Sequence, residues 1–237
     1  MIEAVLFDVD DTLYEPMEPF KRAFAAAFPD AAGSGRIPIA ELYAASRRHA
    51  EVSFKRLQAG DITFLEHNIY RITKACADFG LNISREEAVF FQERYQEEQE
   101  NIVLFPEMAE LFEKLSERNL LLGVLTNGPA EHQWKKINKL GLAKWIPEEN
   151  MFVSEEIGRS KPDIEAFRYI ESKLGLDGSK TVFIGDSFEN DVIGAKNAGW
   201  KAIWLNHRRR QMPAGGVVPD ETLFYPEALL RSKILFP

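Results

Sequence analysis

The fold is decided by residues 3–14, which read Glu-Ala-Val-Leu-Phe-Asp-Val-Asp-Asp-Thr-Leu-Tyr. The first half is a short continuous apolar run, which is typical of a strand buried on both faces of a parallel sheet. The second half supplies three carboxylates within four positions, at Asp8, Asp10 and Asp11. Because like charges so close together repel, and burial adds to the cost, this pattern favours a bound hard cation such as Mg²⁺. A solvated acidic turn remains the alternative for this segment alone.

The order of elements along the chain predicts an α/β domain with a second domain inserted into it. Apolar runs at 120–125, 151–153, 181–184 and 202–205 predict strands, and helical patterns alternate with them. Residues 15–100 show helical periodicity and no convincing strand, with a capping-box signal at Ser84 and Glu87 and a predicted loop at 30–35. We therefore predict a Rossmann-like parallel sheet core from residues 1–14 and 101–237, and an all-helical domain from residues 15–100.

Composition and charge exclude several classes of protein. The chain has 237 residues, is 45% hydrophobic and carries a net charge of −8, which disfavours a nucleic acid polymer or an anionic membrane as partner. The single cysteine, Cys76, excludes an internal disulfide and a cysteine-rich zinc site, and its helical context predicts a core position. With no membrane-spanning run and no signal-like start, we expect a cytoplasmic protein. Arg208–Arg210, followed by Pro213–Gly216, predict an exposed loop whose arginines are surface residues.

Polar residues gather where the predicted strands end. Taken singly, they have ordinary explanations: Thr126 and Asn127 could cap a helix, and Lys161 could be an exposed lysine. Asp186 and Asp191 could be a turn residue and a helix cap. However, Lys161 stands at a helix start, where a cation opposes the helix dipole. The carboxyl ends of parallel strands share one edge of a sheet, so the joint pattern predicts a single site at that edge.

Four segments resemble, in order, the four motifs of the haloacid-dehalogenase-like (HAD) superfamily. They are Asp8-Val9-Asp10-Asp11-Thr12-Leu13, Thr126-Asn127, Ser160-Lys161-Pro162 and Gly185-Asp186-Ser187-Phe188-Glu189-Asn190-Asp191. The resemblance covers nearly the whole chain, and the helical insert is similar to the C1 cap of subfamily I. It implies the HAD fold, and it is specific for the superfamily but not for a substrate.

The resemblance implies a role for each carboxylate. Asp8 would be the nucleophile that forms an aspartyl-phosphate, and Asp10 would protonate the leaving oxygen and then deprotonate water. The second role is expected to need a pKa of Asp10 lifted toward the working pH. Mg²⁺ would be held by Asp8, the backbone carbonyl of Asp10 and Asp186, while Asp191 would orient a metal-bound water or Lys161.

The remaining motif residues are expected to bind the phosphoryl group. Thr126 and the Asn127 amide would donate to phosphate oxygens at a helix start, with Gly128 beside them. Lys161 would neutralise both the phosphoryl group and the nucleophile.

The expected function is hydrolysis of a small phosphorylated metabolite, such as a sugar phosphate, a phosphoglycolate-like compound or a nucleotide, by a monomer or homodimer. A phosphomutase of the same fold and a non-catalytic phosphometabolite-binding protein remain alternatives. A dehalogenase is disfavoured because similar dehalogenases lack an acid at the position of Asp10. A phosphonatase would need a reactive lysine in the cap, and nothing marks Lys55 or Lys74 as one.

Overall fold

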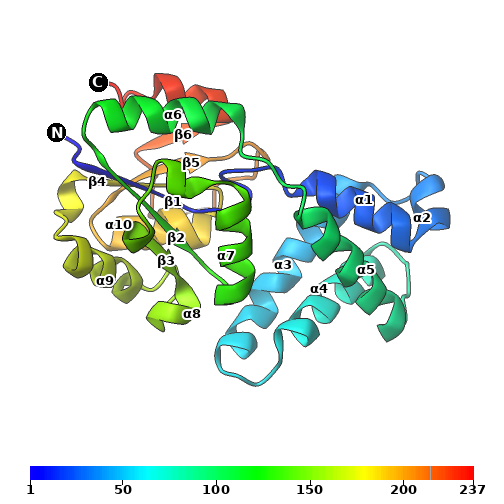
Figure 1. Ribbon diagram of the computed structural model, residues 1–237. Helices are drawn as coiled ribbons and strands as arrows, with labels where there is room; N and C mark the ends of the chain where they lie inside the picture. The colour runs from blue at the N-terminus through cyan, green and yellow to red at the C-terminus, as the bar shows by residue number, and fades with distance from the viewer. Residues whose placement is uncertain (214) are drawn as a thin grey trace. The chain divides into compact units, whose positions relative to one another are not determined.

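The computed structural model describes residues 1–213 and 215–237, and within them a six-stranded parallel sheet is formed (Figure 1). The strands are β1 (Ala4–Phe7), β2 (Leu121–Thr126), β3 (Met151–Val153), β4 (Thr181–Gly185), β5 (Lys201–Leu205) and β6 (Glu221–Leu223). They lie in the order β3-β2-β1-β4-β5-β6, and all neighbours are parallel. The predicted α/β parallel core is confirmed. Ala214, in the loop predicted from the arginine run onward, lies outside the described residues.

β1 lies inside the sheet because it pairs with β2 on one side and with β4 on the other. The register places Phe7 beside Val124 of β2 and Ile184 of β4. All four residues of β1 are almost completely buried, which explains the continuous apolar run. The strand order reverses between β1 and β4, and open parallel sheets bind ligands beyond the carboxyl ends of the strands at such a point. Asp8 and Asp186, which directly follow β1 and β4, therefore stand at the place where a ligand is expected.

Helices cover both faces of the sheet (Figure 1). They are α6 (Pro106–Glu117), α7 (Ala130–Lys139), α8 (Ser154–Ile157), α9 (Ile164–Leu174) and α10 (Gly194–Asn197). On one face, the rings of Phe7 in β1 and Phe112 in α6 meet edge to face at 5.0 Å. On the other face, Phe167 of α9 packs against Phe183 of β4 at 5.5 Å and against Trp200 at 5.3 Å. Burying each of these rings contributes about 1.5–3 kcal/mol, so both helical layers are firmly attached to the sheet.

The strand β6 was not predicted from the sequence. It is three residues long, Glu-Thr-Leu. It is the last strand in the sheet order and pairs with β5. Its residues are half-buried, so the continuous apolar run that marks the inner strands is missing.

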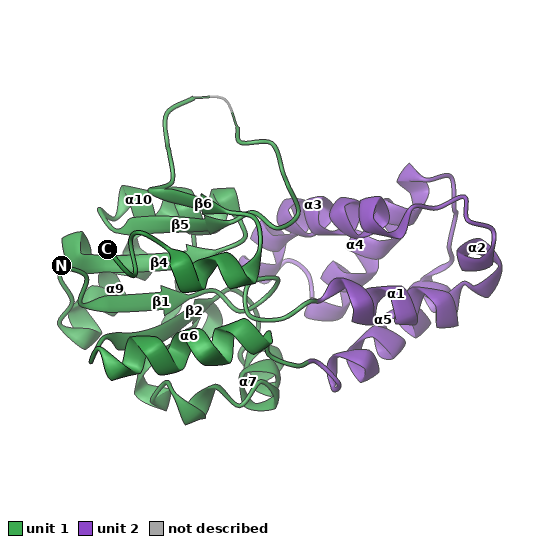
Figure 2. Ribbon diagram, turned by 90° about the horizontal axis from the view of Figure 1, so that it is seen from above, with its two compact units in different colours: residues 1–15, 103–237 green, residues 16–102 purple. Residues whose placement is uncertain are grey.

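A second packed unit is formed by residues Pro16–Ile102, separate from the sheet unit of Met1–Glu15 and Val103–Pro237 (Figure 2). Its helices are α1 (Met17–Ala27), α2 (Pro29–Gly33), α3 (Ile39–Gln58), α4 (Phe64–Asp78) and α5 (Arg85–Gln99). α3 packs along α4 and α1 along α5, around Phe20, whose ring meets Tyr43, Phe91 and Tyr95 edge to face. Cys76 is buried in this core, and burial raises the pKa of its thiol to about 12, as suits a core residue. Among the described residues, no helix combines the length and apolarity needed to cross a membrane.

Local sequence signals explain the ends of these helices. The predicted capping box is confirmed: the Ser84 backbone N–H donates to Glu87 at 2.7 Å, and the Glu87 N–H donates to the Ser84 hydroxyl at 3.2 Å. The loop predicted at 30–35 is wrong in part, because α2 occupies Pro29–Gly33. Pro29 stands in its first turn, where the missing N–H is not needed, and two alanines favour the helix.

The buried histidine of the helical unit predicts a pH-dependent stability. His67 is 5% exposed, its Nδ1 lies 2.7 Å from the Ser53 hydroxyl, and burial together with the charge of Arg71 lowers its pKa to about 4. The unfolded chain takes up a proton near the ordinary pKa of 6.5, so stability is lost as the pH falls from 6.5 toward 4. We expect the free energy of unfolding in urea to fall between pH 7 and pH 5 by about 2 kcal/mol more in the wild type than in His67→Gln. Parallel pH dependences of the two proteins would contradict this prediction.

Candidate active site

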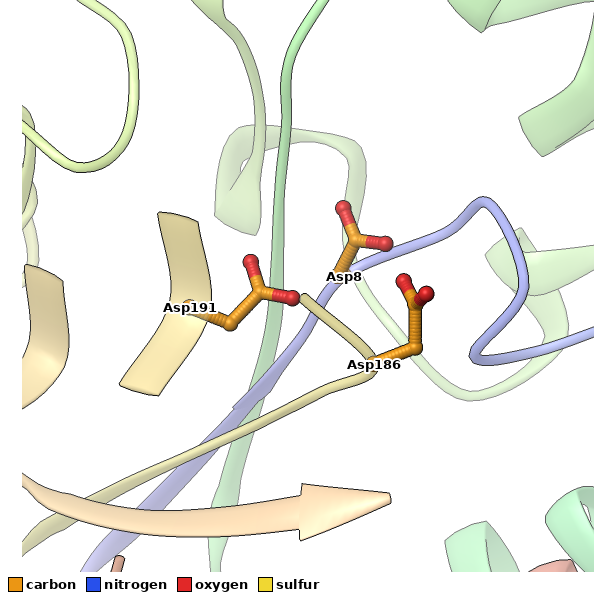
Figure 3. Close-up of side chains that lie close together, drawn as sticks. All are labelled: Asp8, Asp186 and Asp191. Atoms are coloured by element: carbon orange, nitrogen blue, oxygen red, sulfur yellow. The ribbon is translucent and has the colours of Figure 1, made fainter. Parts of the chain in front are cut away.

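Three aspartates converge at the carboxyl ends of β1 and β4 (Figure 3). Asp8 directly follows β1, Asp186 directly follows β4, and Asp191 lies in the π-helical turn Phe188–Ile193. Each is less than 10% exposed, and each offers a carboxylate oxygen within 4.8 Å of the other two. Three buried carboxylates at this distance repel strongly unless cations compensate them.

Lys161 is a cation of the chain that contacts two members of this cluster. Its ammonium lies 2.6 Å from Asp8 Oδ1 and 2.7 Å from Asp191 Oδ1, and the residue is almost completely buried. Its backbone is held in turn by the Asn127 side chain, which donates to the Lys161 carbonyl at 2.8 Å and accepts from the Lys161 N–H at 3.0 Å. The side-chain amide of Asn127 thus holds the backbone of Lys161 in place.

The pKa values of Asp8 and Lys161 reflect their burial and their contacts with one another and with Asp191. Burial raises the pKa of Asp8 to about 7; Lys161 opposes this shift, and the nearby carboxylates, Asp191 first, add to it. Burial by itself would lower the pKa of Lys161, but Asp191 and Asp8 outweigh burial and raise it above its ordinary value. Lys161 therefore stays charged, and the cluster as a whole keeps an excess of negative charge that a further cation would relieve.

The carboxylate of Asp10 is bound by a separate group of donors. Lys136 Nζ lies 2.7 Å and 2.8 Å from its two oxygens, Gln133 Nε2 donates at 3.0 Å, and the Tyr14 hydroxyl also donates to it. Burial would raise the pKa of Asp10, but the charge and hydrogen bonds of Lys136, followed by those of Tyr14 and Gln133, lower it well below its ordinary value. The expected upward shift is therefore wrong in this structure, because the sequence did not reveal that a buried lysine faces this aspartate.

The turn after β2 is tied to the rest of the site by side chains. The Thr126 hydroxyl donates to Gln133 Oε1 at 3.3 Å, and the Gly128 N–H donates to the Ser154 hydroxyl at 3.0 Å. Gly128 has φ +143°, and a Cβ at this position would come within 2.8 Å of Gln133 Nε2. Glycine is thus needed here both for the backbone conformation and for the close approach of Gln133.

Backbone and indole contacts hold Asp186 and Asp191 in place. The Ser187 N–H donates to Asp191 Oδ2 at 2.9 Å, and the Trp204 indole donates to the Asp186 carbonyl at 2.8 Å. A Cβ on Gly185 would lie 2.2 Å from Asp191 Oδ2, so the side chain of Asp191 can fold back over the end of β4 only because this residue is glycine.

The prediction that the arginines after β5 are surface residues is wrong for two of the three. Arg208 donates to both oxygens of Asp11, at 2.8 Å and 3.2 Å, and His207 Nε2 lies 2.9 Å from the Asp11 carbonyl and 3.1 Å from Asp11 Oδ1. Arg210 Nη2 lies 3.0 Å from Asp186 Oδ2. Asp11 is fully buried at φ +66°, so its charge requires cations. Of these arginines, only Arg209 is exposed. The signal in the sequence that could have revealed the contact with Arg208 was Asp11, the third carboxylate of the first motif.

The residues present fit a hard divalent cation. The donor atoms of Asp8, Asp186 and Asp191 are all carboxylate oxygens, which suit Mg²⁺ and disfavour soft metals. The contact of Arg210 with Asp186 already brings one positive group to the same carboxylate. These contacts show that the cluster is built to hold positive charge.

The contact between Arg208 and Asp11 predicts a large and specific loss of stability. We expect Arg208→Gln to lower the free energy of unfolding by about 2–3 kcal/mol, because the Asp11 carboxylate stays buried with fewer cations. The double variant Asp11→Asn/Arg208→Gln also removes the charge of Asp11. Its loss in free energy of unfolding, measured in urea, should be smaller than the sum of the losses in the two single variants. The exposed neighbour provides the control, since Arg209→Gln should change stability by less than about 0.5 kcal/mol. Additive effects in the double variant would contradict the pairing.

Comparison with known proteins identifies a family and several relatives. A family model for haloacid dehalogenase-like hydrolases matches residues 2–199. Glyceraldehyde 3-phosphate phosphatase of Methanothermobacter thermautotrophicus is 27% identical over 87% of this chain and 86% of its own length. Ribulose-1,5-bisphosphate 5-phosphatase of Halopiger xanaduensis is 30% identical over 86% of this chain and 84% of its own.

A solved structure shares the fold. The HAD-hydrolase YfnB from Bacillus subtilis, bound to magnesium, has a TM-score of 0.73 and 24% identity, and the match covers 100% of this chain and 99% of that one. The parallel sheet, the helical insertion after β1 and the match over residues 2–199 together lead to one conclusion: the chain belongs to the haloacid dehalogenase-like hydrolase family.

Proposed function

We propose that this hydrolase is a Mg²⁺-dependent phosphatase that cleaves a small phosphorylated metabolite through an aspartyl-phosphate on Asp8. The observation that carries the proposal is the buried cluster of Asp8, Lys161, Asp186 and Asp191, in which a carboxylate nucleophile lies against a lysine and two further carboxylates. Support also comes from the two relatives above, both of which are named as phosphatases of phosphorylated sugars.

The first half of the reaction transfers the phosphoryl group to Asp8. A carboxylate oxygen of Asp8 attacks phosphorus, and the bond from phosphorus to the ester oxygen breaks. Lys161 stays charged beside Asp8, so it offsets the negative charge of the incoming phosphoryl group. Asp10, two residues further on, is ionised beside Lys136, so it takes up a proton from solvent before it transfers one to the departing alcohol oxygen, which leaves as the free alcohol.

The second half releases phosphate. Asp10 removes a proton from a water molecule, the water oxygen attacks phosphorus, and the Asp8 carboxylate is regenerated as inorganic phosphate departs. The proton that Asp10 lost in the first half is thereby recovered. Thr126, at the end of β2, and the turn that follows it contribute donors near the phosphoryl group.

The metal would be held by the side chains of Asp8 and Asp186 and the backbone carbonyl of Asp10, with Asp191 supporting them. When bound, Mg²⁺ supplies positive charge that offsets the repulsion between the Asp8 carboxylate and an anionic substrate.

The range of substrates proposed is small phosphorylated metabolites, namely sugar phosphates, phosphoglycolate-like compounds or nucleotides. The relatives support the first of these, since glyceraldehyde 3-phosphate and ribulose-1,5-bisphosphate are both phosphorylated sugars. A panel of such compounds would rank them by kcat/KM.

Removal of the proposed nucleophile tests the mechanism. We expect the wild type to release phosphate from p-nitrophenyl phosphate with Mg²⁺ and not after its removal with EDTA. Asp8→Asn should lower kcat by at least about 10³-fold, because an amide oxygen cannot replace the carboxylate nucleophile. Asp30→Asn, an exposed aspartate of the helical unit, serves as the control and should retain wild-type activity. Activity that survives in Asp8→Asn would overturn the proposed mechanism.

A further inference from the structure

Two side chains of α7 reach into the site, although none of the four motifs contains them. Gln133 and Lys136 are three residues apart, so they share one face of the helix. Both are buried, at 3% and 5% exposure. The neighbouring Lys135 instead points outward and pairs with Glu131 at 2.7 Å across one helical turn. One face of α7 therefore carries polar side chains inward, where an ordinary amphipathic helix would carry apolar ones.

Burying Lys136 removes its charge from water, which is costly. The carboxylate of Asp10 compensates this charge. The ammonium contacts both carboxylate oxygens, at 2.7 Å and 2.8 Å. A lysine that served only to support the helix would keep its charge in water, as Lys135 does. The position of Lys136 is thus explained by what it does to Asp10.

Gln133 connects Asp10 to the turn after β2. Its Nε2 donates to Asp10 Oδ2 and to the Asn127 carbonyl, both at 3.0 Å, and its Oε1 accepts from the Thr126 hydroxyl at 3.3 Å. The absence of a Cβ at Gly128 leaves the space that this amide occupies. One buried side chain therefore sets the position of Asp10 relative to the turn that the proposed function assigns to the phosphoryl group.

We propose that Gln133 and Lys136 are positioning residues, which hold the Asp10 carboxylate in the orientation from which it exchanges a proton with the leaving oxygen. This inference rests on the proposed phosphatase function and adds two residues to it. A carboxylate without such donors would rotate about its side-chain bonds, and an error of about 1 Å at a reacting group can cost on the order of 10²-fold in rate. Because both side chains act on the carboxylate of Asp10, their loss should affect proton transfer more than substrate binding.

The test compares two neighbouring lysines and two leaving groups. Lys136→Met and Lys135→Met are assayed with phenyl phosphate and with p-nitrophenyl phosphate at saturating Mg²⁺. We expect Lys136→Met to lower kcat for phenyl phosphate by on the order of 10²-fold while KM changes by less than about threefold. The loss for p-nitrophenyl phosphate should be smaller, because its leaving group departs as a more stable anion and needs less help from an acid. Lys135→Met should behave as the wild type with both esters.

Two further variants keep the test decisive if Lys136→Met folds poorly. Lys136→Arg retains a cation that can bind both carboxylate oxygens, and it should recover most of the lost kcat. Gln133→Glu keeps the shape of the side chain but places an acceptor against Asp10, and it should show the same selective loss with phenyl phosphate. Circular dichroism and thermal unfolding confirm that each variant is folded.

Several outcomes would overturn the inference. Wild-type kcat in folded Lys136→Met, equal losses with both esters, or an effect on KM alone would show that these residues do not position Asp10 for proton transfer. A wild type that releases phosphate from neither ester would instead overturn the proposed function, and this inference would fall with it.

Discussion

The site depends on one buried group, the Lys161 ammonium, which contacts both Asp8 and Asp191. Three carboxylates within 4.8 Å of one another could not remain buried at the end of a sheet without compensating charge. Lys161 supplies the nearest positive charge, and Asn127 holds its backbone through two hydrogen bonds. Burial keeps the pKa of Asp8 raised although Lys161 opposes this shift, and the three carboxylates still attract a cation. The same excess of negative charge that makes folding costly at this point makes metal binding favourable.

Further cations contact half-buried Asp10 and buried Asp11 and Asp186. They come from two segments of the chain, α7 and the residues after β5. Asp10 is bound by Lys136 of α7, Asp11 by Arg208 after β5, and Asp186 by Arg210. These pairs join segments more than a hundred residues apart for Asp10 and nearly two hundred for Asp11. The acidic turn after β1 is therefore the point at which the elements of the sheet unit are coupled, and a parallel sheet makes this coupling possible by bringing all carboxyl ends to one edge.

The same arrangement separates two tasks. The carboxylates of Asp8, Asp186 and Asp191 attract a cation. The carboxylate of Asp10 is instead held in a fixed orientation by Tyr14, Gln133 and Lys136. A carboxylate bound on both oxygens loses little further freedom when it acts, which is how enzymes preorganise a proton-transferring group. The two neighbours in sequence, Asp10 and Asp11, contact different cations, Lys136 and Arg208, and Asp11 has a left-handed backbone conformation.

The sequence by itself determined the parallel α/β core, the helical insertion and the family, because buried strands, helical periodicity and strand-end motifs are local patterns. It did not reveal β6, whose residues are only half-buried, or α2, a five-residue helix in a stretch that resembles a loop. Only the tertiary structure decided which cation meets which carboxylate. The side chain of Lys136 looks the same in sequence as that of Lys135, and the arginines after β5 look like a surface run. Whether a charged side chain is buried depends on what lies opposite it in space, and that partner can come from any part of the chain.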